Sequence, residues 1–336
     1  MDVKMEVHHP TKKDFMAKFE RFEPVVMDHS AVIVAKQCKR RYFYRIVLGF
    51  QEKVTPQFFG FGTCVHKFAE VLEEQYMELA KVERSKSPDL KTRDLPAVQL
   101  GMAQVALNAT RELWKKKHMR DPVVGDRFDF LTEKRLVESC LEWVKHWQAE
   151  KKAGRIEVIA TEQNFIVPLP DGSLVAGKAD QIIRWNGKVW GRDFKTSSKE
   201  QNAYYTRTLD PNDQFTRYTW AEQQLCGEPV QGQLVQVIYN AKGTKATPKK
   251  GPKIFTHLAT RSQRQIDKWV EEQMFYNKLL KLMRDEDVYP MEEANCAFCP
   301  YHSVCKAPSE GAQMAKLEAE FKIEPWDCIH RGPEDD

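Results

Sequence analysis

The sequence lacks a long apolar run, and this absence argues against one class of protein. No stretch within its 336 residues approaches the roughly 20 apolar residues that a membrane-spanning helix needs. Its first residues, MDVKMEVHHPTKKDF, also lack the apolar segment of a secretory signal peptide. We therefore expect a protein without a membrane segment, located in the cytoplasm, or in the nucleus if it is eukaryotic.

The sequence also lacks a strong charge of one sign. Its 52 Lys and Arg residues are nearly balanced by 48 Asp and Glu residues, with a formal net charge of +4, so the overall charge does not indicate a nucleic-acid partner. Basic residues gather locally in segments 36–45, 114–120 and 240–253, although each alone is equally typical of a solvated surface. No phosphate-binding loop of the form GxxxxGK[ST] occurs, so we expect no bound ATP.

Cysteine, by contrast, is present in a pattern that suggests a metal. Without an export signal the eight cysteines are expected to be reduced thiols. Three of them, Cys296, Cys299 and Cys305, lie within ten residues of one another, and a tetrahedral sulfur site needs a fourth ligand. Apart from Cys38, the remaining cysteines have no such spacing and are explained as small buried thiols; they are Cys64, Cys140, Cys226 and Cys328.

Hydrophobic periodicity divides the chain into a helical half and a mixed half. An i, i+3, i+4, i+7 pattern predicts a helix over 59–82, with Thr63 as its N-cap, and two more helices follow at about 97–118 and 130–152. After Gly154 the period becomes two, and Asp-Gly and Asn-Gly turns predict a three-stranded antiparallel meander. Further elements are expected as a helix at about 211–226, strands at 233–240 and 253–260, and a helix at about 261–284.

The second hairpin of this meander places two like charges together. A two-residue turn at Asn186 and Gly187 sets Asp180 directly opposite Asp193, with Cβ atoms roughly 4.5–5.5 Å apart. A raised pKa, a salt bridge or a bound cation could offset the repulsion. Lys195 shares the face of Asp193 because strand side chains alternate. Two carboxylates that hold Mg²⁺ or Mn²⁺ beside a lysine suit metal-assisted phosphodiester hydrolysis, although a D-x-K triplet alone is more often an ordinary exposed hairpin pair.

Four short motifs follow one another along the chain and together are more specific than any one of them. They are Gly62-x-x-x-His66, the G-x-x-D of Gly177 to Asp180, the D-x-K-T of Asp193 to Thr196, and Gln214-x-x-x-Tyr218. In this order they resemble the PD-(D/E)xK nuclease superfamily, and within it the RecB-like exonucleases. That branch includes the RecB nuclease domain, AddB, the CRISPR-associated RecB-type exonuclease and phage-encoded relatives.

The resemblance implies a fold and a division of the chain. The fold class is α/β, with a restriction-endonuclease-like core in which a central mixed β-sheet is flanked by helices, together with a helical insert. The expected parts are an N-terminal segment (1–60), a helical part with the motif histidine and the insert (61–153), the nuclease core (154–290), and a C-terminal cysteine cluster and tail (291–336).

The resemblance also implies roles for individual residues. Those that hold Mg²⁺ or Mn²⁺ would be His66, Asp180, Asp193 and the Phe194 carbonyl. Lys195 would be the catalytic lysine, acting with Asp180 and Asp193. Gln214 and Tyr218, one helical turn apart, would line the active site and contact the DNA strand. Glu162 stands on the preceding strand where many relatives carry a glutamate.

A fourth cluster ligand is implied in the same way. Relatives that carry an iron–sulfur cluster take one cysteine from a C-x-R-x-aromatic segment far upstream, and Cys38 in QCKRRYFYR resembles it. Cys38 with Cys296, Cys299 and Cys305 would then bind a [4Fe–4S] cluster that staples the two ends of the domain together. Zn²⁺ remains the alternative occupant, because C-x2-C is also half of a zinc ribbon.

The activity implied is that of a Mg²⁺- or Mn²⁺-dependent deoxyribonuclease. It would hydrolyse phosphodiester bonds as an exonuclease on single strands or free DNA ends, in recombination, repair or phage DNA processing, and in the host cytoplasm if phage-encoded. Protein partners in recombination or CRISPR adaptation are compatible with it. The alternatives are a CRISPR spacer-processing type of nuclease and a nucleic-acid-binding subunit with an unused nuclease fold.

Overall fold

The computed structural model describes residues 26–53, 56–91, 95, 100–117, 119–122, 128–199, 201–242 and 251–327. The chain divides into two compact units, which are treated separately. One joins Met1–Val54 to Lys278–Cys328, and the other consists of Thr55–Asn277 and Ile329–Asp336. Most of the basic segment 240–253 and the predicted buried thiol of Cys328 lie outside the described residues.

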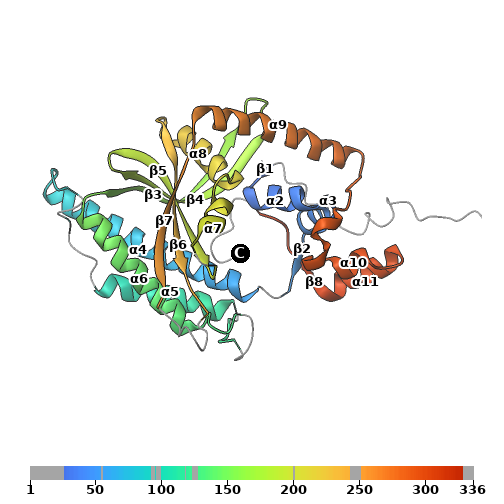
Figure 1. Ribbon diagram of the computed structural model, residues 1–336, viewed down its shortest axis with the longest axis horizontal. Helices are drawn as coiled ribbons and strands as arrows, with labels where there is room; N and C mark the ends of the chain where they lie inside the picture. The colour runs from blue at the N-terminus through green and yellow to red at the C-terminus, as the bar shows by residue number, and fades with distance from the viewer. Residues whose placement is uncertain are drawn as a thin grey trace, which may run out of the picture. The chain divides into compact units, whose positions relative to one another are not determined.

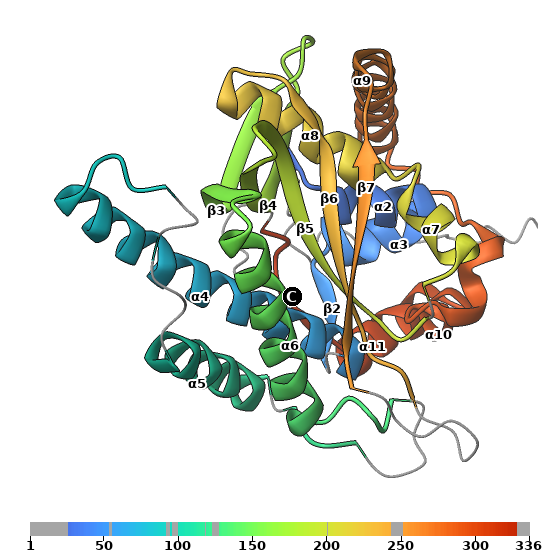
Figure 2. The same cartoon turned by 60° about the vertical axis from the view of Figure 1, so that its left-hand side comes forward.

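The larger unit is built on a mixed sheet in which the strands of this unit follow the order β3–β4–β5–β6–β7 (Figures 1 and 2). Strands β3, β4 and β5 form the predicted antiparallel meander, β6 runs parallel to β5, and β7 runs antiparallel to β6. Their bounds are β3 (Ile156–Pro168), β4 (Leu174–Trp185), β5 (Lys188–Ser197), β6 (Val230–Tyr239) and β7 (Lys253–Thr260).

The turn between β4 and β5 has the geometry that its sequence predicts. Asn186 and Gly187 both have positive φ, 48° and 78°, as a type I′ turn requires. Pairing then runs from Trp185↔Lys188 to Gln181↔Arg192, which confirms the predicted register over this stretch. The ladder ends there, one residue before Asp180 on β4 and Asp193 on β5.

Helices cover both faces of this sheet, which confirms the predicted mixed α/β class (Figure 2). One face carries α4 (Gln57–Lys86), α5 (Leu100–Lys116) and α6 (Glu133–Lys152). Their apolar sides enclose a core that includes Phe194 of β5 and Ile238 of β6. On the other side, α8 (Asp213–Cys226) and the first part of α9 (Gln263–Asp285) pack on β3 and β4, and α7 (Ala203–Leu209) precedes α8.

The start of α4 differs from its prediction. The helix begins at Gln57, so Thr63 is an interior residue whose hydroxyl donates to the Phe59 carbonyl at 3.0 Å, and the N-cap prediction was wrong. Gly60 and Gly62, which precede Thr63, do not interrupt the helix. At Gly60 an added Cβ would lie 2.5 Å from the Met119 sulfur, so the glycine allows a close contact that compensates for its low helix propensity.

The smaller unit is assembled from two segments far apart in the sequence. Its helices are α2 (His29–Gln37), α3 (Lys39–Tyr42), α10 (His302–Cys305) and α11 (Glu310–Glu320). Strand β2 (Phe50–Glu52) pairs antiparallel with β8 (Phe321–Ile323). A small core joins the two segments, because Phe50 packs with Tyr301, Val304, Leu317 and Phe321.

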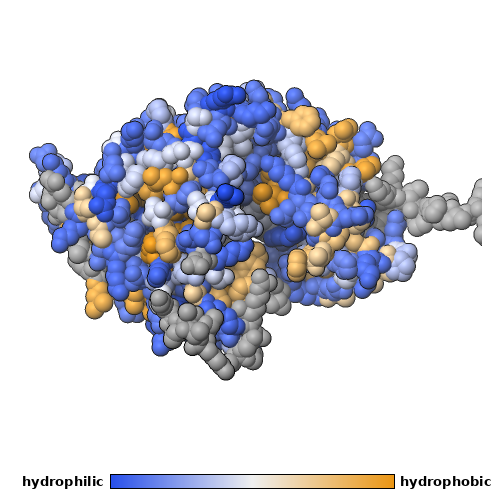
Figure 3. All heavy atoms as spheres, in the orientation of Figure 1, coloured by the Kyte–Doolittle hydropathy of each residue, from blue (hydrophilic) through white to orange (hydrophobic). Residues whose placement is uncertain are grey.

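Figure 3 shows a face that is mainly hydrophilic, with small separate apolar patches. None of the described helices combines the length and the apolar composition needed to cross a bilayer. Several aromatic side chains are nevertheless exposed, including Phe58, Phe59, Tyr204, Phe275 and Phe298.

Candidate active site and cysteine pocket

The first cluster of candidate residues lies where the β4–β5 ladder ends. Beyond Gln181↔Arg192 the strands no longer pair through their backbones. Instead, the Asp180 carboxylate accepts a hydrogen bond from the Phe194 backbone N–H at 2.8 Å. The end of the hairpin therefore holds an aspartate side chain between the two strands.

Two cations approach the two aspartates from different elements. Lys195 Nζ donates to Asp193 Oδ1 at 2.8 Å, so these residues share a face of β5 as predicted. His66 of α4 places its Nδ1 3.4 Å from Asp180 Oδ2. Asp193 is only 1% exposed. Four sequence-predicted residues from one helix and two strands thus lie in one cluster.

The pKa values in this cluster follow from burial and from the paired charges. Burial and the neighbouring Asp180 raise the pKa of Asp193 to about 6, against the influence of Lys195. Burial would also raise the pKa of Asp180, but His66 and Lys195 outweigh it and lower that value. Burial lowers the pKa of His66, but the carboxylate of Asp180 raises it more strongly. The resulting pKa of His66 is about 9. The carboxylates are therefore accommodated by two ion pairs and one raised pKa.

One oxygen of this cluster has no hydrogen-bond partner. Asp193 Oδ2 is buried and unsatisfied, which is costly for a carboxylate. Within the described residues, no group of three or more His, Cys, Asp or Glu side chains is arranged so that it could hold a metal ion. The donor chemistry still fits a hard divalent cation, which prefers carboxylate oxygens.

Glu162 on β3 lies at the same level of the sheet. The residues on either side of it pair with β4 in a register that sets Glu162 opposite Asp180. Its φ of 47° is unusual for a residue other than glycine, and its Oε2 lies 2.6 Å from Lys178 Nζ. Burial and Asp180 raise the pKa of Glu162 to about 7, although Lys178 opposes the shift. Three neighbouring strands thus carry carboxylates in one row.

Helix α8 borders this cluster and carries the Q-x-x-x-Y motif. Its N-cap Asn212 accepts from the Gln214 backbone N–H, and the Gln214 side chain donates to Tyr218 Oη at 3.4 Å, so both motif residues share a face. The Tyr218 ring stands edge-on to Phe165, with centroids 6.0 Å apart. Phe165 in turn fills the space that a Cβ at Gly177 would need, since the two would be 2.5 Å apart.

Sequence reasoning missed Glu222, which continues the same face of α8. It lies one turn beyond Tyr218, is fully buried, and accepts a hydrogen bond from Gln233 Nε2 at 2.6 Å. Burial raises the pKa of Glu222 well above its usual range, and the negative charge of Asp193 adds to the shift. The four-residue spacing Gln214, Tyr218, Glu222 was the signal available in the sequence.

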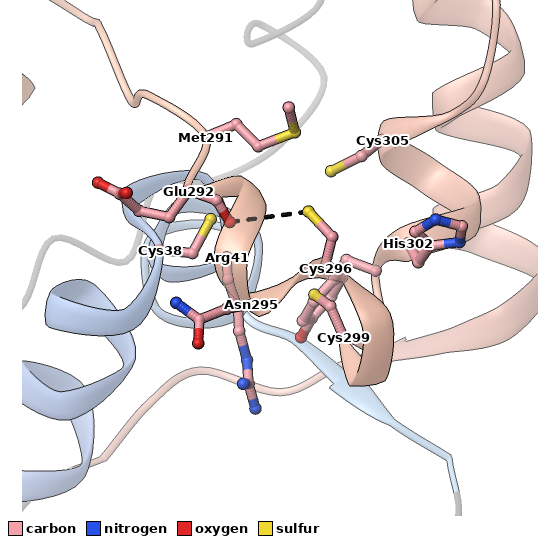
Figure 4. A pocket seen from close by; sticks show the side chains of 10 residues that line it. Cys38, Arg41, Met291, Glu292, Asn295, Cys296, Cys299, His302 and Cys305 are labelled. Carbon is pink, nitrogen blue, oxygen red and sulfur yellow. Dashed lines mark hydrogen bonds between the residues drawn. The ribbon is translucent and has the colours of Figure 1, made fainter.

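The second cluster is a pocket in the smaller unit lined by four cysteines (Figure 4). Cys38 lies between α2 and α3, and the other three come from the segment around α10, more than 250 residues later. All four are free thiols; Cys38 is buried and Cys296, Cys299 and Cys305 are partly buried. Cys296 Sγ donates to the Glu292 carbonyl at 3.7 Å.

The composition of this pocket fits a thiophilic group. Four sulfur donors without a disulfide are the ligand set of iron–sulfur clusters and of tetrahedral zinc. Burial raises the pKa values of Cys299 and Cys305. The charge of Arg41 lowers the pKa of Cys299, and that of Arg40 lowers the pKa of Cys305. Both arginines therefore favour the thiolate, which is the form that binds a metal. The described thiols are not, however, drawn together as a metal site.

Comparison with known proteins identifies a family. A family model described as the PD-(D/E)XK nuclease superfamily matches residues 29–306. Among 19 matching solved chains is the crystal structure of SSO0001, with 13% sequence identity, coverage of 85% of this chain and 87% of that chain, and a TM-score of 0.29. That TM-score is too low to support any argument. No curated protein matches the sequence.

Proposed function

Because the chain belongs to the PD-(D/E)XK nuclease superfamily, we propose that it is a Mg²⁺- or Mn²⁺-dependent deoxyribonuclease of the RecB-like branch. Its substrate would be single-stranded DNA or the free ends of duplexes, cut as an exonuclease during recombination, repair or phage DNA processing. The observation that carries this proposal is the buried, unsatisfied Asp193 Oδ2, which lies beside Lys195 and next to Asp180 in a cluster that excess negative charge would otherwise destabilise.

Each residue of the cluster then has a part. His66, Asp180, Asp193 and the Phe194 carbonyl would hold the cation, which when bound polarises the phosphate and acidifies a water molecule. Lys195, 31% exposed at its side chain, would stabilise negative charge on the phosphate. On α8, Gln214 and Tyr218 would contact the DNA strand.

We further propose that the four cysteines of the pocket hold a [4Fe–4S] cluster. Such a cluster would link Cys38 covalently to the C-terminal segment and so stabilise the smaller unit. Zn²⁺ is the competing occupant, since it accepts the same four sulfurs.

The nuclease proposal is tested with end-labelled single-stranded and duplex DNA in Mg²⁺ and in Mn²⁺. Lys195→Ala and Asp193→Asn should each reduce cleavage by about 100-fold or more, as is typical when a charge-stabilising or metal-binding group is removed. Lys188→Ala is the matched control, because Lys188 is an exposed lysine at the other end of the same strand. Undiminished cleavage by both site variants would refute the site. A wild-type protein that binds DNA but cuts in neither metal would favour a binding subunit.

The cluster proposal is tested by purification without oxygen. We expect a brown protein with about four iron and four sulfide per chain, and Cys38→Ser should lose both the colour and stability. Cys226→Ser, which changes a partly buried thiol of α8 outside the pocket, should lose neither. Colourless wild-type protein with stoichiometric zinc would overturn the iron–sulfur assignment.

A further inference from the structure

Two exposed aromatic rings lie in contact at the first turn of α4. Phe58 is 40% and Phe59 57% exposed, and their ring centroids are 4.2 Å apart. Phe58 also contacts Phe128, with centroids 5.2 Å apart. A single exposed aromatic side chain is ordinary, but rings clustered in contact form a small apolar surface at which a flat ligand can stack.

Phe59 lies on the same face of α4 as His66 of the proposed cation site. Phe59 and His66 are seven residues apart, which is nearly two helical turns, so they share a face about 10.5 Å apart along the axis. Gly62 lies between them on this face, and a Cβ there would come 3.3 Å from Thr196 Oγ1, next to Lys195. The glycine therefore allows the Thr196 side chain of β5 to approach α4 closely between the rings and His66.

One described residue from each of two basic segments lies near these rings. The Gln57 side chain donates to the Arg120 carbonyl at 3.1 Å, which brings the end of segment 114–120 to the start of α4, with Arg120 exposed. Lys242, at the start of the basic segment 240–253, lies 3.1 Å from Asp129, the neighbour of Phe128. The exposed Arg120 thus lies beside the start of α4, whereas Lys242 is paired with Asp129; basic side chains beside aromatic rings are typical of surfaces that bind single-stranded nucleic acid.

We propose that Phe58 and Phe59 form a stacking platform for the bases of a single strand whose backbone continues to the cluster around Asp193. At 3.4 Å per stacked nucleotide, the distance to His66 corresponds to about three nucleotides. The platform deepens the proposed function and rests on it: bases must be unpaired to stack there, so the rings favour single strands and frayed ends over intact duplex.

The test measures whether the loss of affinity caused by removing one base depends on the presence of the two rings. A labelled thymidine oligonucleotide and a set of copies, each with one abasic position, are titrated by fluorescence anisotropy in Ca²⁺, so that binding is measured apart from cleavage. For the wild type we expect one or two abasic positions to weaken binding by about 10-fold or more, the usual size of one base–aromatic stack. In the Phe58→Ala, Phe59→Ala double variant this dependence on position should vanish.

Three further variants separate stacking from other roles of the rings. Phe59→Trp should keep the dependence of binding on the abasic position, whereas Phe59→Leu should lose it. If the ring acted only as an apolar group, Phe59→Leu would keep this dependence as well. Phe275→Ala, at a ring of α9 that is 70% exposed, should leave the wild-type profile unchanged. Circular dichroism and thermal unfolding establish that each variant is folded.

The outcomes also separate this proposal from the nuclease itself. An identical abasic profile in wild type and double variant, with Lys195-dependent cleavage intact, would overturn the platform and leave the nuclease standing. A base-dependent profile that the double variant loses, without any cleavage in Mn²⁺, would support the platform and refute the nuclease. If the double variant changes only the oligomeric state, the rings bind a second copy of the chain and the platform is refuted.

Discussion

The most informative single substitution lies on the sheet face opposite Asp193. Glu73 of α4 is fully buried and accepts a hydrogen bond from the Trp147 indole. Its carboxylate lies 3.5 Å from Arg192 and 3.6 Å from Lys151, both of which are also buried. Arg192 precedes Asp193 and hydrogen-bonds to Gln181 on one side and to the next strand on the other. Glu73 therefore compensates the charge that ties β5 to its neighbours.

The expected cost of Glu73→Gln follows from these distances. With an effective dielectric constant of about 20, each of the two ion pairs is worth roughly 5 kcal/mol of Coulomb energy. Desolvation offsets most of this, and breaking a buried pair from one side typically costs about 3–5 kcal/mol. Burial already lowers the pKa of Lys151, with Glu73 the largest opposing influence. Removing the charge of Glu73 lowers the pKa of Lys151 further, which limits the cost of leaving the ammonium unpaired, so we expect a loss near the lower end of this range, about 3 kcal/mol.

The assay is urea unfolding followed by the fluorescence of the eight tryptophans, one of which, Trp147, contacts Glu73. Glu78→Gln is the matched control, because Glu78 lies on the same helix and pairs with Lys81 at 3.8 Å with both side chains more than two-thirds exposed. We expect it to cost less than about 0.5 kcal/mol. Equal losses for the two variants would refute the view that Glu73 neutralises a buried cationic pair.

Two further predictions concern the motif residues. Gly177→Ala should displace the Phe165 ring and with it Tyr218, at about 1–3 kcal/mol of stability and with reduced nuclease activity; an unchanged unfolding midpoint would contradict the packing argument. In metal-free protein, the pKa of His66 is raised from 6.5 to about 9, so its contribution to stability is complete below pH 6.5 and is lost as the pH rises through 9. Unfolding in EDTA across this range should show the decline in wild type and less of it in His66→Gln, and parallel curves would refute the pairing with Asp180.

Local chemistry decided which parts of the fold were predictable from the sequence. The register of β4 and β5 followed from Asn186 and Gly187, because the turn type and the strand period together fix which residues face each other. The start of α4 did not follow, because Gly60 is compensated by a contact with Met119, some 60 residues away. Propensity reports only local preference, and tertiary packing can override it.

The buried charged residues are a second feature that could not be predicted from the sequence. Glu73, Lys151 and Arg192 lie on a helix, another helix and a strand, and nothing in the sequence indicates that they meet. The spacing of Glu222 from Tyr218 could in principle have identified it, but a glutamate at the end of a helical face is usually solvent-exposed, whereas Glu222 is buried. Only the packing of α8 on the sheet reveals that this carboxyl group is buried near Asp193.

The carboxylates at the end of the hairpin show why such a site would favour a cation. Asp180 is satisfied by the Phe194 N–H and by His66, and Asp193 Oδ1 by Lys195, but Asp193 Oδ2 has no hydrogen-bond partner. Protonating Asp193 would relieve the repulsion, yet its pKa of about 6 leaves it mainly ionised at neutral pH. A divalent ion held by Asp193 would satisfy this oxygen and offset the repulsion between the carboxylates, and Lys195 beside it would supply positive charge for a phosphate.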